Sequence, residues 1–206
     1  ARNRMYQAIL PIRGKILNVE KASIDKVLAN AEIKTMINAF GCGFSEGYGN
    51  DFDIAKLRYH KIVLMTDADV DGMHIRLLII TFFLQFFPDV IRQGHLFVLQ
   101  TPLFRVRNKK ETHYCYSEDE RLKAVSRCGA NAEITRFKGL GEISPDEFRG
   151  FIGQDIRLDK VRLTKDDPIH DMLEFYMGKN TYERQGFIIG NLRIEEDIVE
   201  SDLAIG

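Results

Sequence analysis

The chain has 206 residues, of which 45% are hydrophobic, and this is enough apolar material for one sizeable core or two small ones. The formal net charge of −1 differs from that of a free-standing DNA-binding domain, which is usually strongly basic. The most apolar run, residues 75–87, is too short for a membrane helix, and the three cysteines show no paired spacing, so we expect neither a disulfide framework nor a zinc site.

The start of the chain is locally basic. Pro11 and Gly14 break regular structure there, so we expect Arg13 and Lys15 to lie on a turn. A solvated basic loop is the simplest interpretation of these charges. Residues 23–40 carry apolar side chains at helical spacing and are followed by Gly41, which predicts a helix and then a glycine-rich loop over residues 41–60.

The most informative stretch is KIVLMTDADVDG at residues 61–72. Four consecutive apolar residues, 62–65, are typical of a strand buried on both faces of a parallel sheet. Asp67, Asp69 and Asp71 then alternate with apolar residues, so an extended backbone would place all three carboxylates on one face. Like charges so close repel one another unless a hard cation lies among them. Because ligands of open α/β sheets bind at the carboxyl ends of central strands, we expect a bound cation here.

Several other interpretations fit parts of this stretch. An EF-hand calcium loop is excluded because its twelfth position requires Glu and is Leu78 in this chain. A phosphatase similar to the haloacid dehalogenases would use Asp67 as nucleophile, but it needs a later buried strand that ends in acids. The only candidate pair, Asp166 and Asp167, follows a polar segment. Acids that merely solvate the end of a strand are the plainest alternative.

The remaining sequence alternates helices and strands, which predicts an α/β fold. We expect a helix over residues 74–92, whose first-turn amides would face an anion beside the aspartates and whose His74 and Arg76 are candidates for phosphate contact. The other expected elements, in chain order, are a strand over 94–102, a hairpin of 103–108 with 113–117, a helix over 117–129, a strand over 133–137, and helices over 145–152, 167–177 and 181–192.

Three stretches resemble the B subunit of the type IIA DNA topoisomerases, the family of bacterial gyrase and topoisomerase IV. They are QAILPIRGKILNVEKA at residues 7–22, MTDADVDGMHIR at 65–76 and RFKGLGE at 136–142. The resemblance implies a Toprim domain over residues 1–143, with its N-terminal part missing and a Rossmann-like parallel sheet flanked by helices. Residues 144–206 would form a helical extension that packs on this domain.

The resemblance also implies the site. Asp67, Asp69 and Asp71 would hold one or two Mg²⁺ ions, together with a Glu from upstream sequence that this chain lacks. Lys15 and Asn18 would contact double-stranded DNA. We add four further candidates for DNA contact: Arg13, His74, Arg76 and Lys138.

By the same resemblance, the catalytic tyrosine comes from a partner A subunit, so no residue of this chain is expected to be the nucleophile. The full-length enzyme would be a cytoplasmic, nucleoid-associated A2B2 heterotetramer whose ATP site lies in a missing N-terminal region. We therefore expect this fragment to be inactive alone. The sequence after Glu142 differs from that of most gyrases, and the Toprim region has no large insertion. Both features favour topoisomerase IV. A non-catalytic docking module, whose acids only organise the fold, is the alternative in a different functional class.

Overall fold

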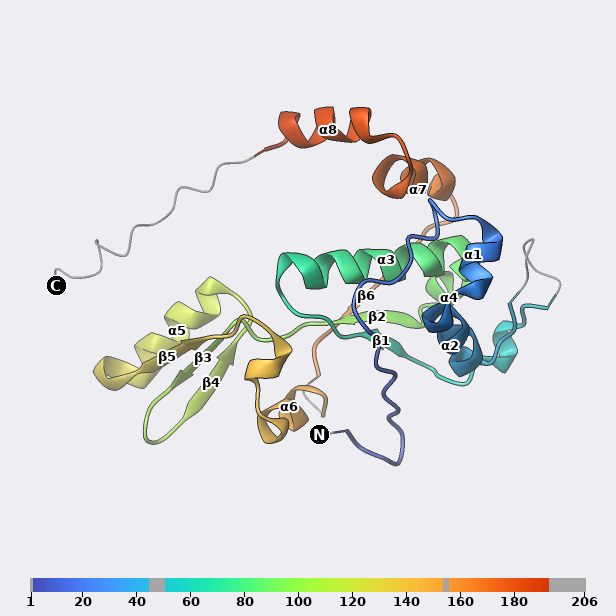
Figure 1. The fold of residues 1–206 in the computed structure, drawn as a ribbon. Coiled ribbons are helices and arrows are strands. Elements are labelled where there is room, and N and C mark those ends of the chain that lie inside the picture. Colours follow the sequence, from blue (N-terminus) through green and yellow to red (C-terminus); the bar gives the residue numbers. More distant parts are fainter. Residues whose placement is uncertain (1, 45–50, 154–155, 193–206) are drawn as a thin grey trace. The chain divides into compact units, whose positions relative to one another are not determined.

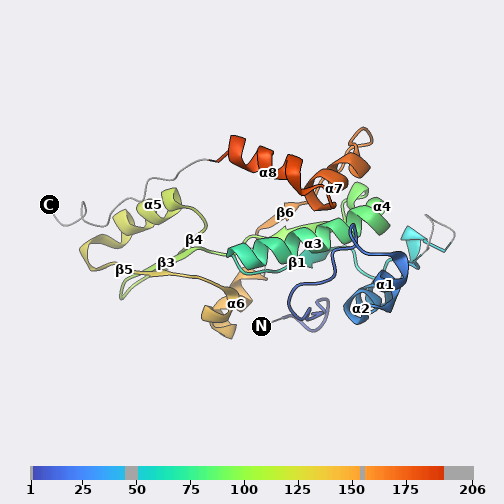
Figure 2. The ribbon, with the colours of Figure 1, turned by 45° about the horizontal axis from the view of Figure 1, so that its top comes forward.

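The computed structural model describes residues 2–44, 51–153 and 156–192. Figures 1 and 2 show their course. The chain forms two compact units, which divide between Asp167 and Pro168. The expected domain boundary after residue 143, and the packing of a helical extension on the first domain, stay predictions. In the described part of the chain no helix is both long and apolar enough to cross a membrane.

The first sheet contains the strand that precedes the aspartates. Strand β1 (Ile62–Leu64) pairs in parallel with β2 (Leu96–Leu99), and β2 pairs antiparallel with β6 (Leu158–Lys160). The predicted α/β fold with parallel pairing is confirmed. Three details differ from the prediction. Among the described residues β1 is an edge strand rather than a central one, and β6 was not predicted. Only Leu64 of the run 62–65 is buried, and Met65 is 37% exposed, so the strand is not buried on both faces. Only Leu158 of β6 is partly buried, so its sequence carries almost no strand signal.

Two predicted helices are each divided in the structure. The helix expected over residues 23–40 is broken into α1 (Ile24–Ala29) and α2 (Ala31–Phe40) by Asn30, whose backbone is extended and whose side chain accepts a hydrogen bond from Ile33 N–H. The expected stop is confirmed, because Gly41 has the left-handed φ of 68° that favours glycine at a helix end.

The second division follows from a proline. Helix α3 (Val70–Phe86) ends before Phe87, and α4 (Pro88–Arg92) begins at a residue that has no N–H to continue the earlier helix. Residue Phe87 is fully buried, and its ring lies 5.4 Å from that of Phe82. Aromatic side chains from α2, α3 and the α3–α4 junction thus build much of the core of the first unit, as shown by the members of this cluster: Phe40, Phe82, Phe83 and Phe87.

The second sheet has the order β4-β3-β5 and is antiparallel throughout. Its strands are β3 (Phe104–Arg107), β4 (Thr112–Cys115) and β5 (Glu133–Arg136), so the predicted hairpin and the later strand are confirmed. Helix α5 (Glu118–Cys128) is capped by Ser117, whose hydroxyl accepts a hydrogen bond from Glu120 N–H. A small core lies between this helix and the sheet and contains Val106, Cys115, Ala124 and Cys128.

Helix α6 (Pro145–Phe151) is joined to the second sheet by one carboxylate. Glu147 completes a capping box with Ser144, accepts a 2.6 Å hydrogen bond from Arg105 and another from Tyr114 at 2.8 Å. The bond from Arg105 lowers the pKa of Glu147 to about 2 against the opposing effect of burial, and the Ser144 and Tyr114 bonds lower it further. This ionised carboxylate therefore links three elements of the chain.

The second unit consists of α7 (Ile169–Met177) and α8 (Thr181–Gly190) in its described part. One guanidinium nitrogen of Arg184 donates to the backbone carbonyls of Phe175 and Tyr176 at 2.9 and 3.0 Å. These bonds satisfy carbonyls at the end of α7, which lack partners within the helix. The unit is a helix pair fastened at its turn. Three short 3-10 helices complete the described fold: Ile54–Lys56, Gly129–Asn131 and Leu140–Glu142.

Candidate metal and nucleic-acid site

Asp67 is held between two glycines that come from distant parts of the sequence. Its Oδ1 accepts a hydrogen bond of 2.7 Å from the backbone N–H of Leu140. A Cβ atom at Gly139 would lie 3.1 Å from the Asp67 carboxylate, and a Cβ atom at Gly72 would lie only 2.1 Å from the Asp67 carbonyl oxygen. A side chain at Gly72 would overlap the backbone, so these glycines allow the close approach that fixes Asp67.

Asp69 has a different environment, at the beginning of a helix. It is the N-cap of α3, and its Oδ1 accepts a hydrogen bond of 2.7 Å from Gly72 N–H. The helix begins at Val70, so the predicted start at residue 74 is wrong. The premise that the backbone stays extended through Asp71 is wrong for the same reason, because Asp71 already lies in the first helical turn.

Asp71 consequently points elsewhere. Two helical residues rotate a side chain by about 200° around the axis, and Asp71 meets Lys15 with its Oδ1 2.8 Å from the ammonium nitrogen. This hydrogen bond and the Lys15 charge lower the pKa of Asp71, with a smaller contribution from His74. Among the described residues, the three aspartates do not form a group whose carboxylate oxygens all lie within 4.8 Å of one another.

The basic residues near the aspartates occupy two kinds of position. Gly14 has a φ of 66°, so the predicted turn is confirmed, and both Arg13 and Lys15 are exposed on it. The Asn18 side chain is engaged locally, because its Oδ1 accepts a hydrogen bond of 3.1 Å from Glu20 N–H. Their contacts with DNA stay predictions, and Lys15 is the one that the structure joins directly to an aspartate.

The candidates that follow the aspartates are also differently placed. His74 is exposed on α3, whereas Arg76 donates from Nε and Nη2 to Thr66 Oγ1 at 3.2 and 3.1 Å. Thr66 is only 8% exposed, so Arg76 braces the segment between β1 and Asp67. Lys138 is exposed, and its backbone N–H donates to Glu142 Oε2 at 2.9 Å. Their DNA-binding roles stay predictions.

Two groups that build the site were missed by sequence reasoning. The Leu140 N–H donates to Asp67, and the Thr66 hydroxyl accepts from Arg76. A backbone amide leaves no signal in a side-chain pattern, and only the fold brings residue 140 to residue 67. Thr66, by contrast, could have been noticed as the polar residue that ends an apolar strand.

The donor set fits a magnesium ion. Asp67 and Asp69 each use Oδ1 for a backbone hydrogen bond, and no hydrogen bond to either Oδ2 is seen among the described residues. Mg²⁺ prefers carboxylate oxygens and is often held by one or two of them, with waters and substrate phosphates completing six positions. Two half-engaged carboxylates therefore suit this ion, whereas the Asp71 carboxylate is already paired with the Lys15 ammonium.

The geometry gives no support to the phosphatase alternative. That alternative needs a later parallel strand that ends in acids, whereas β6 runs antiparallel to β2 and ends at Lys160. Asp167 instead accepts a hydrogen bond of 2.6 Å from Thr164 N–H within a turn.

Comparisons with known proteins agree with the geometry. A family model described as Toprim domain matches residues 1–101. The chain is 51% identical over 187 residues to the B subunit of DNA topoisomerase 4 from Borreliella burgdorferi, which covers 90% of this chain and 30% of that protein. It is 52% identical over 149 residues to the B subunit of DNA gyrase from Clostridium acetobutylicum, covering 71% of this chain and 23% of that protein. The chain thus spans less than a third of the length of these relatives.

A solved structure extends the similarity to the fold. The DNA-binding, cleavage and re-ligation domain of Plasmodium falciparum topoisomerase II matches with a TM-score of 0.74 and 26% identity, over 89% of this chain and 25% of that one. The match covers far more of the chain than the Toprim family model does.

Proposed function

Because the chain belongs, by its Toprim domain and its relatives, to the family of type IIA DNA topoisomerase B subunits, we propose that it is the region that binds magnesium for DNA cleavage and religation. The main support for this proposal is the orientation of two nearby carboxylates. The Leu140 amide holds Asp67, and the Gly72 amide holds Asp69. Backbone donors orient both carboxylates without neutralising them, which leaves their negative charge for a cation.

In this proposal Asp67 and Asp69 hold one or two Mg²⁺ ions, and Asp71 joins them if Lys15 moves to a DNA phosphate. A bound Mg²⁺ supplies charge neutralisation for the oxygens of the scissile phosphodiester. The protein contributes orientation, since Leu140 and Gly72 each fix one oxygen of an aspartate. Thr66 and Arg76 fix the backbone that leads to them.

The DNA would be held through its backbone. Phosphate contacts position a duplex without reading its sequence, and lysine, arginine, asparagine and protonated histidine can all donate to phosphate. Lys15 supports this role best, because it is exposed and lies beside the aspartates. The proposed DNA-contacting residues are Arg13, Lys15, Asn18, His74, Arg76 and Lys138.

The activity belongs to a larger assembly in this proposal. A partner A subunit supplies the tyrosine that becomes linked to DNA, and none of the seven tyrosines of this chain is assigned that role. The full-length enzyme would be an A2B2 heterotetramer that binds ATP in a region outside this chain. Action on chromosomal DNA would place it on the bacterial nucleoid.

Topoisomerase IV is our preferred member of the family. The preference rests on the residues after Glu142 and on the lack of a large insertion in the Toprim region, since the identities to the topoisomerase IV and gyrase relatives are nearly equal. Decatenation without ATP-driven negative supercoiling by the full-length enzyme is the expected result. Negative supercoiling would assign it to gyrase instead.

The metal assignment is tested in the intact B subunit mixed with its A partner. Asp67→Ala and Asp69→Ala should each lose magnesium-dependent DNA cleavage while ATP hydrolysis continues. Asp166→Ala is the matched control, because Asp166 is exposed in a turn and has no place in the site. Wild-type cleavage by either site variant would show that the acids only organise the fold, as in a docking module.

A further inference from the structure

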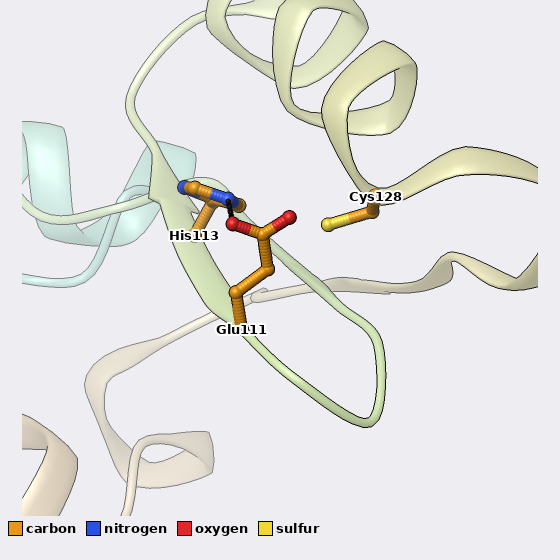
Figure 3. Close-up of side chains that lie close together, drawn as sticks. All are labelled: Glu111, His113 and Cys128. Atoms are coloured by element: carbon orange, nitrogen blue, oxygen red, sulfur yellow. Dashed lines mark ion pairs between the residues drawn. The ribbon is translucent and has the colours of Figure 1, made fainter.

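A second group of metal-ligating side chains lies outside the aspartate site, on the second sheet. Glu111 and His113 come from the end of the β3–β4 hairpin, and Cys128 is the last residue of α5 (Figure 3). Each offers one ligand atom, and the three atoms lie within 4.8 Å of one another. Within residues 2–44, 51–153 and 156–192, no other trio or larger set of His, Cys, Asp or Glu meets this condition.

One atom of the trio lacks the partner that its burial demands. His113 Nε2 is inaccessible to solvent and forms no hydrogen bond within the described part of the chain. It lies 3.0 Å from Glu111 Oε2, as the dashed line in Figure 3 marks, but not in the geometry of a hydrogen bond. Buried polar atoms are nearly always partnered in native proteins, so this atom points to a missing ligand.

The surrounding structure holds the trio in place. The Asn108 side chain donates to the Cys128 carbonyl at 3.1 Å and accepts from Glu111 N–H at 2.9 Å, so one amide braces the hairpin turn against the end of α5. Val106 is opposite His113 in the β3–β4 register and is fully buried in the same core as Cys128. The backbone positions of the three ligands are therefore fixed before any ion arrives.

We propose that Glu111, His113 and Cys128 bind a zinc-class divalent cation, with water in the fourth position. Ligand atoms at about 2.0–2.3 Å from a tetrahedral zinc ion lie about 3.3–3.8 Å apart. The His113 and Glu111 atoms, 3.0 Å apart, are already about that close, and the rest of the trio, within 4.8 Å, needs only a small shift. Thiolate and imidazole ligands select zinc over magnesium, which prefers oxygen. The Cys128 thiol releases its proton to solvent on binding, because the thiolate is the ligand.

One side of the site adjoins a cavity, and a bound ion would have a structural role. A cavity of about 220 Å³ is lined by His113 together with residues of α5, including Lys123 and Arg127. A bound ion would fasten the hairpin to the end of the helix, where four-residue strands enclose only a small core. This role is independent of the magnesium proposed at Asp67 and Asp69. The cysteine spacing predicted no zinc site, because these ligands include a single cysteine.

The test is a titration of the full chain, reduced and freed of metal with a chelator, with Zn²⁺ and then with Co²⁺. We expect one high-affinity ion per chain by calorimetry, and a thiolate-to-cobalt charge-transfer absorption that millimolar Mg²⁺ does not displace. Glu111→Gln should weaken Zn²⁺ binding by at least about 10-fold, the lower bound for losing even an orienting partner of a metal ligand. His113→Ala and Cys128→Ser should abolish the cobalt absorption.

Controls separate this site from adventitious binding. Cys42→Ala removes a buried cysteine and His170→Ala an exposed histidine, both outside the trio, so both variants should titrate as the wild type does. Because Glu111 lies in an exposed turn, Glu111→Gln keeps the test decisive even if Cys128→Ser fails to fold. An unchanged affinity in Glu111→Gln, or a wild-type chain that gives no thiolate absorption with Co²⁺, overturns the proposal.

Discussion

The aspartate site and the second sheet both contain carboxylates, but they hold them with different donors. Asp67 and Asp69 receive hydrogen bonds from neutral backbone amides. Arg105 and Arg107 of the second sheet bind Glu147 of α6 and Glu133 of β5 through charged guanidinium groups, at 2.6 and 2.9 Å. A neutral donor fixes a carboxylate and leaves its charge available, whereas a guanidinium fixes and neutralises it. The kind of donor therefore separates acids that can bind a cation from acids that stabilise the fold.

The largest expected difference concerns DNA cleavage. Asp67→Asn keeps an oxygen to accept from Leu140 N–H but removes the charge, so magnesium-dependent cleavage by the full-length enzyme should fall by about 100-fold or more. Glu147→Gln should leave the cleavage rate within about twofold, because that carboxylate is committed to Arg105. The measurement is the rate of linear DNA formation at saturating magnesium. Equal losses of cleavage rate in the two variants would contradict the distinction between acids held by amides and acids paired with guanidinium groups.

For the free energy of unfolding the order should be reversed, with a larger loss in Glu147→Gln than in Asp67→Asn. Glu147→Gln removes a largely buried charged pair and should cost about 2 kcal/mol of unfolding free energy at pH 7, measured by urea denaturation. Asp67→Asn should cost less. Because the folded-state pKa of Glu147 is about 2 and its ordinary value is 4.5, its contribution is complete above pH 4.5 and is lost as the pH falls towards 2. Glu147→Gln should show less acid destabilisation across that interval than the wild type.

Magnesium should stabilise the first of these regions by a small amount. Binding to the folded chain alone adds about 0.4 kcal/mol when the ion is at its dissociation constant, which a thermal melt can detect as a raised Tm. Asp69→Asn should lose this response while it keeps the N-cap of α3, because asparagine caps helices as well as aspartate does. A full response in Asp69→Asn would remove that carboxylate from the metal site.

The smallest expected effect concerns Asp71, which differs from Asp67 and Asp69 in having a charged partner, Lys15. Lys15→Ala should weaken DNA binding by the full-length enzyme with little dependence on sequence, and should reduce the salt slope of log K by about 0.9, the contribution of one phosphate. Lys21→Ala is a suitable control, because Lys21 is an exposed lysine outside the proposed DNA-contacting set. An unchanged slope in Lys15→Ala would leave Lys15 as a partner of Asp71 only.

Local patterns predicted most of the elements but not how they meet. The strand before Asp67, the hairpin around residue 110 and the Ser117 cap all depend on neighbours in the sequence, and the structure contains each of them, although the strand is less buried than predicted. The sequence DADVDG fits both an extended alternation and a helix cap, because Asp is common at the position before a helix. In the structure Asp69 is the helix cap. Gly72 allows the first turn of α3 to lie against the Asp67 backbone.

The parts that could not be predicted are contacts between distant residues. Leu140 reaches Asp67 across 73 positions, and β6 joins the first sheet with a sequence that is mostly exposed. The Glu111, His113 and Cys128 trio likewise depends on how α5 returns to the hairpin. Neither periodicity nor motif spacing contains that information, since both describe only what lies within one element.

The bond between Leu140 and Asp67 also sets an order of events during synthesis. A ribosome that adds about 5–20 residues per second makes residue 140 several seconds after residue 67. Throughout that interval the nascent chain already carries its acidic motif but has no amide to aim the first carboxylate. The proposed magnesium site is therefore assembled only after residues 138–141 (KGLG) are translated, and a truncated product that ends before them would carry the motif without a properly aimed carboxylate.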